Sequence, residues 1–268
     1  MEEKLYILYA GVNGAGKSTL YQLQGIELPR INTDEIVQQM GGDWRSTRDQ
    51  MKAGKIAAKQ LHEYIKQGVS FNQETTLGGR SMKNTILKAK EQGYQIHMHY
   101  VGLDSADIAI ERVKNRVQKG GHGIPEKDIR RRYEVSLKNL REMIPLLDKV
   151  RLYDNTKVFV PIANINGHIE LTFNYKDAEW AKEVLQDRIV EQMKQDIIQS
   201  GFRPTDKIIQ HMCNLQEKRI EIPTVKDVRE LYKNRELTNM TIDTRREVEE
   251  LGKEFIKQQR MQIYFPER

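Results

Sequence analysis

A glycine-rich segment near the N-terminus constrains this chain more than any other feature. Residues 11–18 read Gly-Val-Asn-Gly-Ala-Gly-Lys-Ser, and they follow directly on an apolar run at 5–10. A short continuous apolar run predicts a strand that is buried on both faces, as in a parallel sheet. The glycines allow the backbone to curl so that successive N–H groups point at a phosphate, and a helix predicted to begin near Lys17 adds its N-terminal dipole.

The segment matches the pattern G-x-x-x-x-G-K-[ST] of a triphosphate-binding loop. In that pattern the lysine bridges the β- and γ-phosphates, and the hydroxyl group of the next residue binds Mg²⁺. A chance match in a glycine-containing turn is the alternative, but a strand before the loop and a helix after it argue against chance. We therefore predict that the chain binds a nucleoside triphosphate with magnesium, with Ser18 as the metal ligand. The residues expected to contact the nucleotide are Gly11, Asn13, Gly14, Ala15, Gly16, Lys17, Ser18 and Thr19.

Strand and helix patterns alternate along the first part of the chain. Strands are predicted at 29–33, 69–73, 94–101 and 150–153, and helices at 46–67, 80–92, 104–119 and 126–148. Such alternation predicts an α/β fold in which a parallel sheet carries helices on both faces.

The pattern changes in the second part of the chain. Asn166-Gly167, between two β-patterned runs, predicts a hairpin, and the chain from Lys176 onward is charged and helical in pattern. We place a domain boundary at residue 175, so that 1–175 is the α/β domain and 176–268 a helical extension or small helical domain. The helices predicted in the extension are 178–200, 205–217, 224–234 and 241–262.

Composition narrows the class of protein. The single cysteine, Cys213, excludes an internal disulfide and fits a reducing compartment. Lysine and arginine number 44 against 38 acidic residues, which describes a mixed surface and makes nucleic acid an unlikely partner. The start of the chain is acidic and lacks the features of a signal peptide, and no stretch approaches the ~18 apolar residues that a membrane span requires. We expect a cytoplasmic protein that does not associate with membranes.

Two acidic residues follow predicted strands and are candidates for the chemistry. Asp34 comes just after the second strand and could accept the proton of an attacking hydroxyl group. The alternative is that Asp34 caps the helix that follows it. Glu74 follows the third strand, and an acid in that position faces the ligand crevice of an open α/β sheet. It could hold Mg²⁺ through water or fix a substrate hydroxyl group, the alternative being a solvated loop residue.

Arginines cluster around a glycine-rich break in the chain. Arg112 and Arg116 share a face of one predicted helix, and 130–132 are three consecutive arginines on the next. The segment 120–125, Gly-Gly-His-Gly-Ile-Pro, would act as a hinge between them. A unit of this kind could close over a triphosphate, neutralise the transferring phosphoryl group and exclude water. The alternative is a basic helix face or a nucleic-acid patch. His122 in the hinge could donate to a phosphate or a sugar, or be structural.

Together these segments resemble the zeta toxin family of P-loop kinases. The similar segments are 11–19, 32–36, 74–76, 112–125 and 129–133, within roughly residues 4–155. The phosphate loop is shared by a very broad superfamily. The Gly-Gly-His-x-Ile-Pro segment with its flanking arginines is far more selective, and it points to this family.

The resemblance implies a three-layer P-loop kinase fold for residues 1–175. It also implies ATP with Mg²⁺, and transfer of phosphate to a hydroxyl group of a UDP-activated amino sugar such as UDP-N-acetylglucosamine. A further implication is an antitoxin protein that blocks the nucleotide site. The residues expected to be catalytic are Asp34, Lys17, Arg116, Arg131 and Arg132, with one of the last two as the second lid arginine. The residues expected to contact the substrate are Glu74, Thr75, Arg80 and His122.

The sequence also allows two other functions. The chain could phosphorylate nucleic-acid ends or nucleosides, which its basic balance allows, or it could be a nucleotide-switched interaction protein. The acid-and-arginine constellation favours a small-molecule kinase, because a pure switch has no need of a base beside the γ-phosphate. The helical extension could be structural, could occlude the site in cis as a regulator, or could dock a separate partner.

Overall fold

The computed structural model describes residues 3–79, 81–200, 204, 206–218 and 221–227. Contacts within the chain divide it into two units, Met1–His168 with Thr172–Leu185, and Ile169–Leu171 with Gln186–Arg268. The helix predicted at 241–262 and most of that at 224–234 lie outside the described residues. None of the described helices has the length and apolar character needed to cross a lipid bilayer.

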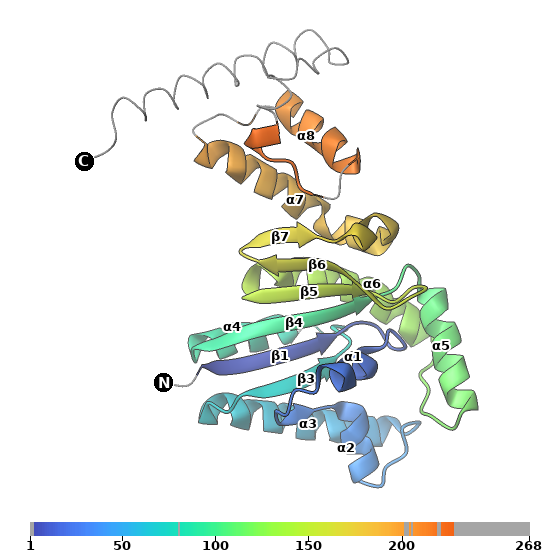
Figure 1. The fold of residues 1–268 in the computed structure, drawn as a ribbon. Coiled ribbons are helices and arrows are strands. Elements are labelled where there is room, and N and C mark those ends of the chain that lie inside the picture. Colours follow the sequence, from blue (N-terminus) through green and yellow to red (C-terminus); the bar gives the residue numbers. More distant parts are fainter. Residues whose placement is uncertain (1–2, 80, 201–203, 205, 219–220, 228–268) are drawn as a thin grey trace. The chain divides into compact units, whose positions relative to one another are not determined.

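The first unit is built on a mostly parallel sheet (Figure 1). Its strands lie in the order β2-β3-β1-β4-β5-β6. Parallel pairs join β2 to β3, β3 to β1, β1 to β4 and β4 to β5, whereas β6 runs antiparallel to β5. The bounds are β1 Lys4–Ala10, β2 Arg30–Ile31, β3 Phe71–Thr75, β4 Tyr94–Gly102, β5 Lys149–Asp154 and β6 Val160–Asn166. The predicted α/β class is confirmed, and the antiparallel β6 makes the sheet mixed.

Helices connect the strands of this sheet. They are α1 Lys17–Gln24, α2 Thr33–Gln39, α3 Thr47–Gln67, α4 Met82–Glu91, α5 Ala106–Gln118 and α6 Glu126–Met143. The helix predicted to reach residue 148 ends instead at Met143 and continues as a 3₁₀ turn over Ile144–Leu146. Pro145 explains the difference, because its ring clashes with the preceding turn and it has no N–H group to donate.

The centre of the sheet is apolar, and its packed strands determine where the phosphate loop lies. Tyr6 and Leu8 of β1 lie beside Ile96 and Met98 of β4, and all four side chains are buried. On the other side of β1, the pairing with β3 sets Tyr9 opposite Glu74. The chain that leaves β1 and the end of β3 therefore meet at one edge of the sheet, where open α/β sheets bind ligands.

The second unit contains the C-terminal part of α7 (Glu179–Gln199) and α8 (Asp206–Lys218), which agree with the helices predicted at 178–200 and 205–217. Gln192 accepts a hydrogen bond from the N–H group of Ile169 at 2.7 Å. Ile169 lies in β7 (His168–Leu171), and β6 and β7 flank Gly167, whose φ of 80° suits the predicted hairpin turn. The boundary at residue 175 stays a prediction.

Candidate active site

The phosphate loop connects β1 to α1 through glycines in conformations that other residues avoid. Gly11, Gly14 and Gly16 have φ of 137°, 81° and 103°. A Cβ atom on Gly11 would lie 2.3 Å from the carbonyl oxygen of Val101, so a side chain there would collide with β4. Gly16 is the N-cap of α1 and has no side chain that could satisfy the first N–H groups of the helix. These N–H groups are therefore available to an anion.

Lys17 is a buried cation at the start of α1, with 6% of the residue exposed. Its Nζ donates to the carbonyl group of Val12 at 3.1 Å and lies 3.7 Å from Oε1 of Glu74. Burial lowers the pKa of Lys17, although the carboxylates of Glu74 and Asp34 act in the opposite direction. A buried cation of this kind gains from a bound anion, which would replace the water that it has lost.

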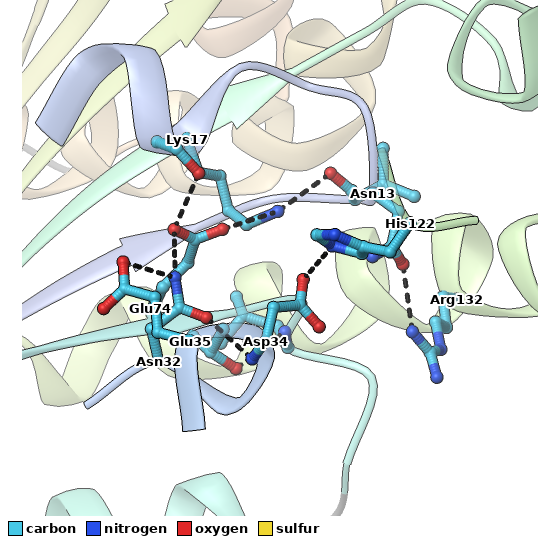
Figure 2. Close-up of polar contacts among 12 residues, drawn as sticks. Asn13, Lys17, Asn32, Asp34, Glu35, Glu74, His122 and Arg132 are labelled. Atoms are coloured by element: carbon cyan, nitrogen blue, oxygen red, sulfur yellow. Dashed lines mark hydrogen bonds and ion pairs between the residues drawn. The ribbon is translucent and has the colours of Figure 1, made fainter. Parts of the chain in front are cut away.

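Glu74 is the centre of a group of polar contacts that we call the Glu74 cluster (Figure 2). Its Oε2 accepts hydrogen bonds from Ser18 Oγ at 3.0 Å, Arg30 Nη2 at 2.7 Å and Asn32 Nδ2 at 3.2 Å. With Lys17 near the other oxygen, two cations and two neutral donors surround the carboxylate. Its side chain is only 13% exposed, so the alternative of a solvated loop residue is wrong.

Asp34 lies in the first turn of α2 and pairs with a histidine from the predicted hinge. The N-cap of α2 is Asn32, whose side chain accepts from the N–H group of Asp34 at 2.9 Å, so the alternative that Asp34 is the cap is wrong. Asp34 Oδ2 lies 2.6 Å from Nε2 of His122 (Figure 2). Burial alone would raise the pKa of Asp34, but the hydrogen bond and charge of His122, with Arg116 and Lys17, outweigh it and hold the pKa below its usual value. The carboxylate is therefore ionised at neutral pH.

The arginine-bearing helices α5 and α6 are tied to the site at two points. Arg116 Nε donates to the carbonyl group of His122 at 2.8 Å, and Arg132 Nη1 donates to Asn13 Oδ1 in the phosphate loop at 3.0 Å. Arg131 is 58% exposed and lies 3.3 Å from Asp128 on its own helix. Of the two alternative lid arginines, Arg132 is thus the one that contacts the phosphate loop.

Two cavities meet at these residues. One, of about 680 Å³, is lined by the phosphate loop with Arg112 and Arg116. The other, of about 650 Å³, is lined by the end of β3 and by α6, including Thr75, Arg131 and Arg132. We call them the loop cavity and the β3 cavity. The residues that line both are Asn13, Lys17, Asn32, Asp34, Trp44, Glu74 and His122.

The structure thus brings together nearly all of the residues singled out in the sequence. Ala15 is buried within the loop, whereas Thr19 lines the loop cavity. Thr75 lines the β3 cavity, and its Oγ1 accepts from the N–H group of Leu77 at 3.1 Å. Arg80 lies outside the described residues.

Three residues of the site had no role assigned from the sequence. Arg30 and Asn32 hold Glu74, and Trp44 lines both cavities. Asn32 stood within a segment similar to the family, but no chemistry marked it. Trp44 follows Gly-Gly-Asp at 41–43, and a tryptophan in a loop of that composition is a signal that could have been used.

Comparison with known proteins identifies relatives of this chain. A sequence profile described as zeta toxin matches residues 1–161. An uncharacterized protein of Haemophilus influenzae is 36% identical over 129 residues, which are 47% of this chain and 91% of that protein. A solved structure from the PezAT chromosomal toxin-antitoxin system of Streptococcus pneumoniae is 18% identical, with a TM-score of 0.43, over 60% of this chain and 71% of that one. A structure of AvrRxo1-ORF1:-ORF2 with ATP is 16% identical, with a TM-score of 0.47, over 66% of this chain and 63% of that one.

Proposed function

Because this chain belongs to the zeta toxin family, we propose that it is an ATP-dependent kinase that phosphorylates a hydroxyl group of a small molecule. The observation that carries the proposal is the position of Asp34, which lines both the loop cavity and the β3 cavity. Direct transfer of a phosphoryl group to a hydroxyl uses a base between the nucleotide and the acceptor. A protein that only switches on binding nucleotide has no use for one.

We assign ATP to the loop cavity. The unsatisfied N–H groups at the start of α1 and the buried ammonium of Lys17 favour phosphate there. Arg116 supports the assignment, because its Nη2 is buried and has no hydrogen-bond partner among the described residues. A buried guanidinium N–H without a partner is costly, and a phosphate oxygen would satisfy it.

The residues beside the phosphate loop fit a magnesium ion. Mg²⁺ takes one or two protein oxygens together with phosphate oxygens and water. The hydroxyl of Ser18 would ligate it, and the carboxylate of Glu74, 3.0 Å from that hydroxyl, would accept hydrogen bonds from its water ligands. Among the described residues, the structure has no group of three or more His, Cys, Asp or Glu that could hold a metal ion. When bound, the ion neutralises charge on the β- and γ-phosphates.

Asp34 acts as the general base in this reaction. The acceptor hydroxyl gives its proton to the Asp34 carboxylate, and its oxygen forms a bond to the γ-phosphorus. The bond from that phosphorus to the β,γ-bridging oxygen breaks, and ADP leaves. Lys17 and Arg116 are cations that act on Asp34, and Arg132 contacts Asn13 of the phosphate loop, so that all three stabilise the charge on the transferring group in the proposed reaction.

We assign the acceptor to the β3 cavity. Its volume of about 650 Å³ suits a small molecule. It offers the ring of Trp44 to a sugar face and the cations Arg45 and Arg131 to a diphosphate. These features support the acceptor that the family implies, a UDP-activated amino sugar such as UDP-N-acetylglucosamine.

A protein that restrains the kinase is also part of the proposal. The family implies an antitoxin that covers the nucleotide site, and residues 176–268 could do the same in cis. Phosphate transfer by the full chain alone, at saturating ATP, would exclude restraint in cis.

To test the proposal, the purified full chain is incubated with Mg·ATP and a panel of UDP-sugars, with oligonucleotides in parallel reactions. The masses of the products are then measured by mass spectrometry. We expect one sugar nucleotide to gain one phosphoryl group. Lys17→Ala, which lacks the phosphate-binding ammonium, is the control that should not make the product. Bound ATP with no phosphorylated acceptor would favour the nucleotide switch, and a phosphorylated oligonucleotide would favour a nucleic-acid kinase.

A further inference from the structure

His122 contacts the acid of the site, which gives it a different role from the substrate contact expected from the sequence. Its Nε2 lies 2.6 Å from Asp34 Oδ2, close enough for a strong hydrogen bond. Among the described residues, Oδ2 is the one oxygen of this carboxylate that has a side-chain partner. Oδ1 therefore remains available to a hydroxyl group.

The segment around His122 is held against α5 and the loop that carries Trp44. A Cβ atom on Gly121 would lie 2.7 Å from Cγ of Arg116 and 3.0 Å from the carbonyl oxygen of that residue. A Cβ atom on Gly123 would lie 2.7 Å from Cγ2 of Val117 and 3.0 Å from Cη2 of Trp44. Both neighbours of His122 are thus pressed against other residues, and its carbonyl group accepts from Arg116 Nε. The backbone that carries the imidazole is therefore held in place.

We propose that His122 is a positioning residue for the base, which holds Asp34 through Oδ2 so that Oδ1 faces the acceptor. Arg116 extends the same chain of contacts to the loop cavity, because its Nε donates to the His122 carbonyl group while its Nη2 has no partner in the part of the chain that the structure describes. A phosphate that binds Nη2 would then fix the position of His122, and through it that of the base. The inference rests on the proposed kinase function.

If His122 positions Asp34, its loss should change how the rate depends on pH. Loss of His122 would remove the hydrogen bond and charge that lower the pKa of Asp34 and leave burial, which raises it, less opposed. The acid side of the rate profile would then move to higher pH. The other charged residues that line the two cavities with Asp34 are Lys17, Glu35, Arg45, Glu74, Arg112, Arg116, Asp128, Arg131 and Arg132. All of them are kept in the variants below.

The experiment compares His122→Ala, His122→Gln and His122→Asn in the full chain, by measuring kcat and both KM values across the acid side of the pH profile. Glutamine can place its amide nitrogen where Nε2 stands, whereas asparagine is too short. We expect kcat to fall by about 10–100-fold in the alanine variant, the size of effect typical when a side chain that orients a functional group is lost. We expect the acid side to move upward in that variant, glutamine to recover more of the rate than asparagine, and the KM for ATP to change least.

The matched control is His62→Ala, which removes an exposed histidine of α3 and should leave the rate and its pH profile unchanged. If the alanine variant raised the KM for the acceptor with kcat and the pH profile unchanged, His122 would be a substrate contact and the inference would be wrong. An equal loss in the glutamine and asparagine variants, with no shift in pH, would indicate a merely structural role. No transfer by the wild type would instead overturn the proposed function itself.

Discussion

Glu74 and Asp34 are two acids at the same edge of the sheet, and their surroundings differ sharply. Glu74 is 13% exposed and receives hydrogen bonds from Ser18, Arg30 and Asn32, with Lys17 near its second oxygen. The side chain of Asp34 is 36% exposed, and His122 is its one side-chain partner among the described residues.

The difference separates two tasks that an acid can perform in one site. A carboxylate whose lone pairs are taken by buried donors is fixed in position and contributes a permanent negative charge. A carboxylate with one held and one unpartnered oxygen can still accept a proton from a substrate. Glu74 is therefore suited to holding Lys17 and Ser18 in place, together with the water ligands of the proposed metal, and Asp34 is suited to the proposed chemical step.

The strongest test of this division is Asp34→Asn, which removes the proton acceptor and keeps the shape of the side chain. We expect kcat to fall by about 10²–10⁴-fold, the usual contribution of a general base. Affinity for ATP should be unchanged or higher, because a negative charge that faces the phosphates is lost. Product formation and the dissociation constant of ATP, measured on the same preparation, check both expectations.

The same variant also tests the structural side of the comparison. Asp34 is part of a partly exposed pair, so the free energy of unfolding should fall by less than about 1 kcal/mol. A variant that still transferred phosphate at the wild-type rate would show that Asp34 is not the base.

Replacing the lid arginine Arg132 should have the next largest effect on the rate. Arg132→Ala removes the guanidinium that contacts Asn13 in the phosphate loop, and we expect kcat/KM for ATP to fall by about 100-fold, as when a donor to a transition state is lost. Arg130→Ala is the matched control, because Arg130 lies two residues away on the same helix, is exposed, pairs with Asp107 and lines neither cavity. Steady-state kinetics of the two variants, compared with each other, provide the test. Equal losses would mean that the lid uses both arginines.

Glu74→Gln should lower the stability of the fold and weaken the binding of Mg·ATP. It removes the buried carboxylate that Arg30 and Lys17 share, so we expect the free energy of unfolding to fall by about 2–3 kcal/mol, the range for buried hydrogen bonds to charged groups. The KM for Mg·ATP should rise by about 30-fold through the loss of support to the metal's ligands. Denaturant unfolding without nucleotide and a titration of magnesium give the two values.

The control for this variant is Glu35→Gln. Glu35 lies 2.9 Å from the same Arg30 but its side chain is 43% exposed, so both effects should be small. If Glu35→Gln destabilised the protein as much as Glu74→Gln, burial would not be what distinguishes the Glu74 cluster.

The sequence predicts the strands and the loop that carry this site better than it predicts the contacts between the site's residues. The phosphate loop and the strand before it were predicted because apolar runs and glycines act locally. The third strand was predicted at 69–73 and lies at Phe71–Thr75 instead. Residues 72–75 are all polar, and pairing with β1 is what makes them a strand, so Glu74 was expected in a loop.

Contacts between distant segments could not be predicted in the same way. Asp34 and His122 are 88 residues apart in the sequence, and no local pattern marks their pairing. The choice between the two lid arginines could, however, have been predicted from the sequence. Ile129 faces the core, and helical geometry puts Arg132, three residues on, beside that buried stripe and Arg131 on the far side. Periodicity could have separated two neighbours that the family pattern left open.

Arg30→Lys tests the smallest part of the comparison, the geometry of the Glu74 cluster at constant charge. The guanidinium of Arg30 reaches Glu74 and Glu35 with its two Nη atoms and stacks 3.8 Å above the ring of Tyr21, whereas a lysine offers a single point charge. Losing one of several hydrogen bonds to Glu74 should raise the KM for Mg·ATP by about 5-fold, equivalent to about 1 kcal/mol, and leave kcat nearly unchanged. Initial rates at varied Mg·ATP measure both constants. A fall in kcat with KM unchanged would contradict this expectation, because it would mean that the Glu74 cluster acts on the chemical step that we assign to Asp34.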